Sequence, residues 1–337
     1  MPAVSVTLPC YNAEATLPAC LDSLLAQEGV DFEIVAADDG STDRTGEIIE
    51  EYSHWDERVR PLSLPHGGVA RAAMAAIDAS RGRYVARMDA DDLALPGRLE
   101  AQAAHLDAHP GTGLVGCRVR FGGSRAKARG YSHYVDWTNA QRTAGAISLN
   151  RFVELPVPNP SIMFRRELVE RYGGYEQGDF PEDYDMLLRW LEAGVVMEKV
   201  DRELLVWNDP PTRLTRSDPR YDPEAFYRVK AAYLARWLKR RNPHHPVIRV
   251  LGAGRPTRKR AEMLLAHGVA IEAFHDVDPR KVGAVLRGRP VLHRDEVPPP
   301  GEAFLVSYVA TRGARDDIAA FLASRGYGLG LHWIAAA

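Results

Sequence analysis

The sequence is poor in cysteine and has no long run of apolar residues. Its three cysteines, Cys10, Cys20 and Cys117, are odd in number and lack the spacing of a metal site, which is typical of a protein kept in a reducing compartment. No apolar run approaches the ~18 residues that a membrane-spanning helix needs. The N-terminal residues MPAVSVTLPCYN do not have the pattern of a signal peptide. These absences predict a cytoplasmic protein.

The chain also lacks an excess of charge of either sign. It carries 43 Lys plus Arg against 45 Asp plus Glu, a formal net charge of −2. A general nucleic-acid-binding protein needs a large basic surface, so we expect no nucleic-acid partner. Of the 337 residues, 45% are hydrophobic and 26% charged, which is the composition of a globular protein. At ~150 residues per domain, this length predicts about two domains.

Strand-like and helix-like segments alternate through the first hundred residues. Runs rich in β-branched residues predict strands at 4–8, 32–36 and 83–88, and helical spacing predicts helices at 14–27, 47–52 and 69–80. This alternation is typical of a parallel sheet with right-handed crossovers. Ligands of such sheets bind beyond the carboxyl ends of the strands. Four acidic residues stand at these ends: Asp38, Asp39, Asp89 and Asp91.

The remainder of the chain is less regular until a second α/β pattern begins. Residues 110–180 are rich in Gly, Pro and Arg and predict loops and short strands. We expect a first domain at 1–216, a helical linker at 217–246 and a smaller α/β domain at 247–337.

The motif Asp-x-Asp occurs three times, as Asp89-Ala-Asp91, Asp183-Tyr-Asp185 and Asp276-Val-Asp278, so position must distinguish them. Asp89 and Asp91 follow a strand that ends in the expected ligand crevice, and residues two apart on an extended segment face the same side. Both carboxylates can therefore bind one divalent cation. The alternative is an acidic helix-capping loop before Pro96.

Three other acidic residues also allow two interpretations. Asp38 and Asp39 can accept hydrogen bonds from a nucleobase or ribose, or from the amides of their own turn. Asp183 begins a helix, where the macrodipole favours an ionised carboxylate. It can be a helix cap or a general base.

Four ordered motifs together resemble family 2 glycosyltransferases over residues 3–215. They are Leu8-Pro-Cys-Tyr-Asn12, Ala37-Asp-Asp-Gly-Ser-Thr-Asp43, Ala86-Arg-Met-Asp-Ala-Asp-Asp92 and Pro181-Glu-Asp-Tyr-Asp185. The resemblance implies the GT-A fold, a mixed but mainly parallel sheet flanked by helices. It also implies residue roles. Pro9, Tyr11, Asn12, Asp38 and Asp39 match positions that hold the donor base and ribose, and Asp89, Ala90 and Asp91 match the metal and diphosphate motif. Asp183 matches the catalytic base with Glu182 beside it, and Trp207, Arg213 and Arg216 resemble a loop that closes over the diphosphate.

One segment departs from the family pattern. Met74 stands where relatives usually carry Asn. Arg71, three residues earlier, is a candidate for a positive charge near the diphosphate, or else a solvated helix residue.

The resemblance implies a metal-dependent inverting glycosyltransferase acting on a surface glycan or other glycoconjugate. Mn²⁺ or Mg²⁺ on Asp89 and Asp91 would neutralise the leaving diphosphate, and Asp183 would deprotonate the acceptor hydroxyl. We expect a nucleoside diphosphate sugar as donor, with a UDP-sugar favoured, and a glycan, lipid-linked or protein acceptor. The alternatives are a catalytically silent nucleotide-sugar-binding protein and a sugar nucleotidyltransferase. A nucleotidyltransferase would carry a Gly-rich basic loop after the first strand, where Leu8 to Asn12 stand instead.

The C-terminal domain resembles the Rossmann-like appendages of some bacterial family 2 enzymes. Gly252-Ala-Gly254 is followed by a helix, but the third glycine of a dinucleotide-binding turn is missing. We therefore expect packing or homo-oligomerisation rather than NAD(P)-dependent catalysis. The basic helix 228–241 is either a peripheral contact with the inner face of the membrane or a solvated helix with its aromatic residues turned inward.

Overall fold

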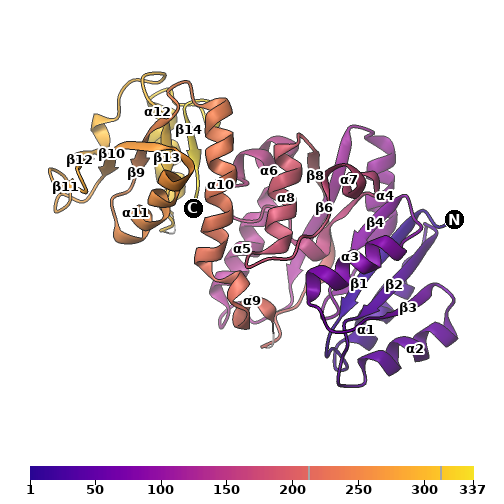
Figure 1. Ribbon diagram of the computed structural model, residues 1–337. Coiled ribbons are helices and arrows are strands. Elements are labelled where there is room, and N and C mark those ends of the chain that lie inside the picture. Colours follow the sequence, from indigo (N-terminus) through magenta and orange to yellow (C-terminus); the bar gives the residue numbers. More distant parts are fainter. Residues whose placement is uncertain (212, 312) are drawn as a thin grey trace. The chain divides into compact units, whose positions relative to one another are not determined.

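The computed structural model describes residues 1–211, 213–311 and 313–337, and the chain divides into two compact units (Figure 1). The first unit comprises Met1–Ser148 and Leu155–Tyr221, and the second comprises Leu149–Glu154 and Asp222–Ala337. Six residues in the middle of the chain thus belong to the second unit. So does the helix that fills most of the expected linker, α10 (Pro223–Arg241).

The first unit is built on a mixed, mainly parallel sheet with the strand order β3-β2-β1-β4-β7-β6-β8-β5. Its first half is parallel and comprises β1 (Val4–Cys10), β2 (Phe32–Asp38), β3 (Val59–Ser63) and β4 (Tyr84–Arg87). Its second half comprises β5 (Leu93–Ala94), β6 (Thr112–Phe121), β7 (Met163–Arg165) and β8 (Val196–Trp207). Strand β7 runs antiparallel between β4 and β6, whereas β6 and β8 are parallel. The predicted fold class is confirmed.

Helices flank this sheet (Figure 1). Their apolar residues recur at helical spacing and are buried, as Leu17, Leu21 and Leu24 of α1 illustrate. The helices on this unit are α1 (Leu17–Leu25), α2 (Thr45–Trp55), α3 (Val69–Ala79), α4 (Arg98–Ala108), α5 (Arg129–Ala140), α6 (Ala144–Asn150, whose last two residues belong to the second unit), α7 (Glu167–Tyr172), α8 (Glu182–Glu192) and α9 (Leu214–Ser217).

The prediction of loops and short strands over residues 110–180 is wrong in part. The ten-residue strand β6 and the helices α5 and α6 lie there. The glycines in β6 are not turn residues, because a Cβ added to Gly113 would lie 2.7 Å from Val195 Cγ1, and one added to Gly116 would overlap Val157. They permit close packing against a central strand.

The second unit carries a six-stranded sheet with the order β11-β12-β10-β9-β13-β14. Its strands are β9 (Val247–Leu251), β10 (Ala270–Asp276), β11 (Val285–Leu286), β12 (Arg289–His293), β13 (Leu305–Ser307) and β14 (Trp333–Ala335), and its further helices are α11 (Arg255–Glu262) and α12 (Ala314–Ser324). All pairings except that of β11 with β12 are parallel, as the predicted Rossmann-like domain requires. In the turn after β9, the amide of Ala253 donates to Asp276 Oδ2 at 2.7 Å. This amide is therefore already hydrogen-bonded to a carboxylate of the chain.

The apolar side of α10 is buried within the second unit. The Trp237 ring lies 6.1 Å from Phe152 and 5.9 Å from Phe304, each in an edge-to-face arrangement. The basic residues 239–241 are exposed. No helix in the described part of the chain is both long and apolar enough to cross a membrane.

Candidate active site

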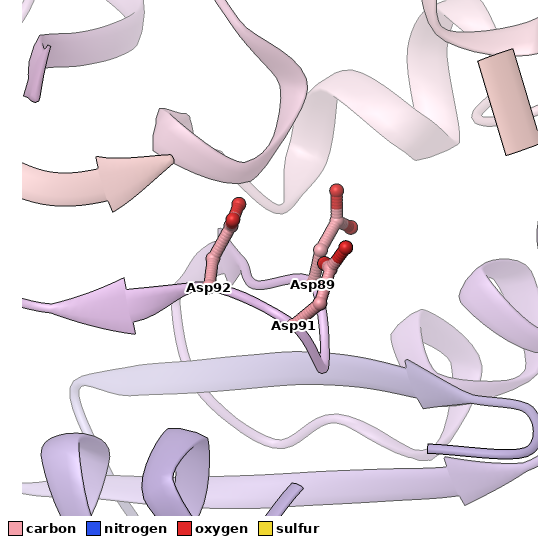
Figure 2. Close-up of side chains that lie close together, drawn as sticks. All are labelled: Asp89, Asp91 and Asp92. Carbon is pink, nitrogen blue, oxygen red and sulfur yellow. The ribbon is translucent and has the colours of Figure 1, made fainter. Parts of the chain in front are cut away.

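Three acidic side chains meet in the loop that joins β4 to β5 (Figure 2). One carboxylate oxygen from each of Asp89, Asp91 and Asp92 can be chosen so that all lie within 4.8 Å of one another. Asp92 is 1% exposed; its Oδ1 accepts a hydrogen bond from the Asn208 amide at 2.8 Å, and its Oδ2 has no partner among the described residues. The sequence predicted Asp89 and Asp91 as a metal pair but did not include Asp92.

The electrostatics of this cluster suit a divalent cation. Burial, followed by the charge of Asp89, raises the pKa of Asp91 to about 6. Burial and the charges of Asp91 and Asp89 likewise raise the pKa of Asp92. Three carboxylates so close together repel one another unless a positive charge joins them, and carboxylate oxygens are the ligands that Mg²⁺ and Mn²⁺ prefer. The residues therefore fit the expected metal.

Arg87, the last residue of β4, contacts this cluster directly. Its Nη2 and Nε donate to Asp89 Oδ1 at 2.6 and 3.0 Å, and its guanidinium lies 5.9 Å from the centre of the Tyr175 ring. Burial, the largest single effect, lowers the pKa of Arg87, but the charge and hydrogen bond of Asp89 together with Tyr175 and the charge of Glu182 raise it overall. The guanidinium is therefore charged. The sequence analysis missed this residue, although it stands two positions before Asp89.

The two candidate acids of the fourth motif begin α8 and have different surroundings. Glu182 is buried, and the Tyr221 hydroxyl lies 2.7 and 2.9 Å from its two oxygens. Asp183 is partly exposed, and its Oδ1 accepts a hydrogen bond from the Tyr184 amide at 2.7 Å. Burial and the charges of Glu182 and Asp89 raise the pKa of Asp183. The charge of the acid cluster thus acts on Asp183. A raised pKa suits a group that accepts a proton.

On the expected donor side, Asp39 is held by the start of α3. Its Oδ1 and Oδ2 accept hydrogen bonds from the amides of Gly67 and Gly68 at 2.9 and 2.8 Å, and His66 Nδ1 lies 2.9 Å from Oδ2. The His66 ring stacks on the exposed ring of Tyr11 with the ring centres 4.2 Å apart. His66 is, after Asp92 and Arg87, a third residue that the sequence analysis did not select.

Asp38 and Asn12 stabilise the neighbouring turn. Asp38 Oδ1 accepts from the Ser41 amide at 3.1 Å, and Asn12 Oδ1 accepts from the Thr42 amide at 2.8 Å. Asp38 thus accepts a hydrogen bond from an amide of its own turn, as one of its two interpretations predicts. Its role toward a nucleotide stays a prediction.

The remaining donor-side candidates lie in three places. Pro9 pairs with Ala37 in the sheet, and Ala90 is buried between Asp89 and Asp91. Arg71 is an exposed residue of α3. Met74, which replaces the usual Asn, accepts a hydrogen bond at its sulfur from the Tyr175 amide at 3.2 Å. The departure at Met74 is therefore accommodated by packing.

Of the three residues assigned to the downstream loop, only Arg213 lies outside a helix or strand, directly before α9: Trp207 is the last residue of β8, and Arg216 lies in α9. The Arg213 guanidinium lies 3.8 Å from the centre of the buried Trp207 ring, and its charge lowers the pKa of Asp91. Arg213 therefore lies near the acid cluster. Arg216 is exposed and pairs with Asp209 at 2.6 Å, so this arginine already has an acidic partner.

Residues 5–173, half of the chain, match the model of the family described as "Glycosyl transferase family 2". The chain belongs to this family. It is 30% identical over 228 residues to an uncharacterized glycosyltransferase, EpsJ, of Bacillus subtilis, a match that covers 64% of this chain and 63% of EpsJ. It is also 40% identical over 100 residues to a chondroitin synthase of Pasteurella multocida, covering 30% of this chain and 10% of that protein. The chain thus spans less than two thirds of these curated relatives.

Two solved structures support the fold. S. aureus TarS 1–349 in complex with UDP-GlcNAc has a TM-score of 0.56 at 20% identity, covering 77% of this chain and 70% of that one. The mannosyltransferase PcManGT from Pyrobaculum calidifontis, in complex with GDP-Man and Mn²⁺, has a TM-score of 0.50 at 21% identity, covering 79% and 69%.

Proposed function

We propose that this chain is a metal-dependent, inverting glycosyltransferase that moves a sugar from a nucleoside diphosphate sugar to an acceptor hydroxyl. The observation that supports the proposal is the cluster of Asp89, Asp91 and Asp92 together with the charge of Asp89 acting on a separate carboxylate, Asp183. Family membership supports the reaction class, and the acid cluster supports the metal.

On the donor side, Asp89 and Asp91 would hold Mn²⁺ or Mg²⁺. Asp92 Oδ2, which has no hydrogen-bond partner among the described residues, belongs to the same cluster. Such a cation neutralises charge on a leaving diphosphate without a proton transfer. Arg213 adds a fixed positive charge next to the same acids. Tyr11 offers a flat surface to a nucleobase, and the ligands named for TarS and PcManGT, UDP-GlcNAc and GDP-Man, support a nucleotide sugar. We favour a UDP-sugar.

On the acceptor side, Asp183 would take the proton of the attacking hydroxyl. Because Asp183 is partly exposed, an acceptor can reach it, and its raised pKa makes it a stronger base than an ordinary aspartate. A single base opposite the leaving group implies one displacement and inversion at the anomeric carbon. A glycan, lipid-linked or protein acceptor fits this chemistry, and the named function of the chondroitin synthase relative supports a glycan.

The decisive experiment is one substitution with two measurements. In Asp183→Asn, transfer should fall about 10²- to 10⁴-fold because the amide cannot accept a proton. Binding of the nucleotide sugar with Mn²⁺, measured by calorimetry after a thermal-shift screen of UDP- and GDP-sugars, should stay within about threefold.

Asp185→Asn is the matched control, because Asp185 lies on the same helix and pairs with Arg189 at 3.1 Å. It should retain transfer. If Asp183→Asn transfers sugar as fast as wild type, Asp183 is not the base. If wild type binds a nucleotide sugar but transfers it to no acceptor, the chain is a nucleotide-sugar-binding protein instead.

A further inference from the structure

Arg87 is buried at the end of β4 and faces the site. Its side chain is 3% exposed and is held on one side by Asp89, which accepts from Nη2 and Nε. Its backbone amide donates to Ile162 of the neighbouring segment at 3.0 Å, so the residue is fixed at both ends.

One donor of this buried guanidinium is unused. Nη1 of Arg87 has no hydrogen-bond partner among the residues that the structure describes. An unsatisfied buried donor is costly, and native proteins rarely keep one without a reason. Arg87 therefore carries a donor that suits a bound molecule.

The neighbouring Arg98 shows what a purely structural buried arginine looks like in this unit. It is fully buried, and each of its three nitrogens has a partner: Nε donates to Gln102 at 3.2 Å, Nη1 contacts Met88 Sδ at 3.0 Å, and Nη2 donates to the carbonyls of Arg87 and Pro160 at 2.7 and 2.6 Å. Arg87 differs from Arg98 in this respect. Nε of Arg118 and Nε of Arg189 in the same unit also lack a hydrogen bond, but they lie 3.3 Å from Asp201 and 3.6 Å from Glu176, respectively.

Arg87 interacts with both acidic parts of the proposed site. It pairs with Asp89 of the acid cluster, and its charge is felt by Asp183. The Tyr175 ring lies beside the guanidinium, but the Tyr175 hydroxyl donates to Asn159 Oδ1 at 2.7 Å and is thus committed elsewhere. In a single displacement, the sugar lies between the leaving phosphate at the acid cluster and the acceptor oxygen at the base.

We infer that Nη1 of Arg87 donates a hydrogen bond to a hydroxyl of the transferred sugar, which makes Arg87 a sugar-binding residue. This inference rests on the proposed function. A hydroxyl is favoured over a phosphate oxygen because the charge of Arg87 is already balanced by Asp89. A neutral acceptor can use the remaining N–H without separating that pair.

The test compares a nucleotide sugar with its own nucleoside diphosphate on the full chain with Mn²⁺. The probes are the sugar nucleotide that raises the melting temperature most among UDP-GlcNAc, UDP-glucose, UDP-galactose and GDP-mannose, and the matching UDP or GDP. Arg87→Lys keeps the positive charge beside Asp89 but loses the second arm of the guanidinium, which carries Nη1. Its affinity for the sugar nucleotide should therefore fall about 10-fold relative to its affinity for the nucleoside diphosphate, which shifts the ratio of the two dissociation constants by the same factor. Arg87→Met should shift the ratio at least as far. Arg83→Met, at the exposed residue directly before the same strand, should leave the ratio unchanged.

An unchanged ratio in both Arg87 variants overturns the inference, as does an equal loss of affinity for both probes, which would mean that Arg87 acts through Asp89 on the diphosphate. If either variant melts well below Arg83→Met, monodeoxy analogues of the sugar nucleotide are titrated into wild type. Equal affinity for every analogue overturns the inference, and an approximately 10-fold loss with one analogue supports it. If wild type binds no nucleotide sugar, the proposed function fails as well, so the two failures are distinguishable.

Discussion

At the scale of single residues, crowding of the carboxylates in the acid cluster affects the stability of the protein when no metal is bound. The pKa of Asp91 is about 6, above the value of 3.8 for an unperturbed aspartate. Between about pH 4 and 6 the folded chain therefore binds more protons at this position than the unfolded chain does. Stability without metal should fall as pH rises through that window.

This leads to a prediction for metal binding. Mn²⁺ needs the ionised carboxylate, so millimolar Mn²⁺ should raise the melting temperature at pH 7.5 and should raise it much less at pH 5. Differential scanning calorimetry at both pH values checks this. An equal rise at the two pH values would show that Asp91 does not titrate with the metal.

Asp91→Asn provides the matched control. The amide removes one negative charge from the cluster, so without metal at pH 7.5 the variant should be at least as stable as wild type, by up to about 1–2 kcal/mol. Its response to Mn²⁺ should be lost.

Sequence reasoning reached this cluster because its determinants are local. Asp89 and Asp91 stand two positions apart directly after a strand, and strand ends of a parallel sheet mark the ligand site. The same spacing places Arg87 beside Asp89, so Arg87 could have been predicted. The contact between Tyr221 and Glu182 could not, because it joins segments 39 residues apart whose approach depends on the folded loop.

At the scale of elements, strand β6 was predicted least well. Its glycines suggested turns, but Gly116 meets Val157, a residue far along the chain, and no local pattern reports such a contact. Strands β1, β2 and β4 were predicted because runs of β-branched residues are visible within short windows. Strand β3 was not predicted.

A glycine substitution tests this explanation of β6. Gly116→Ala should lower the free energy of unfolding by about 1–3 kcal/mol, because the added methyl group overlaps Val157 in a packed core. Gly111→Ala, one residue before β6 and with no atom within 4 Å of its added Cβ, should change it by less than about 0.5 kcal/mol. Urea denaturation measures both. Equal stability of the two variants would contradict the packing explanation.

At the scale of the whole molecule, the two units cannot be separated by one cut. Residues 149–154 belong to the second unit although they lie inside the sequence of the first. Phe152 is 1% exposed, and its ring meets Trp237 of α10. A boundary at the end of the first domain would therefore leave an apolar segment without its partners.

We expect the fragment 1–221 to self-associate for this reason, since exposed apolar surface promotes association. Replacing residues 149–154 in that fragment by a short Gly/Ser loop should make it monomeric. Sedimentation velocity distinguishes the two results, and a monomeric unmodified fragment would contradict this prediction.

The same excursion of the chain has a consequence for biosynthesis. The ribosome makes residues 149–154 early, but α10 and the sheet of the second unit come later. At about 5–20 residues per second, the 183 residues from 155 to 337 take roughly 10–40 s to synthesise. For much of that time, the part of the second unit on which Phe152 and Val153 pack has not been synthesised. The nascent chain therefore exposes an apolar segment that a chaperone can bind.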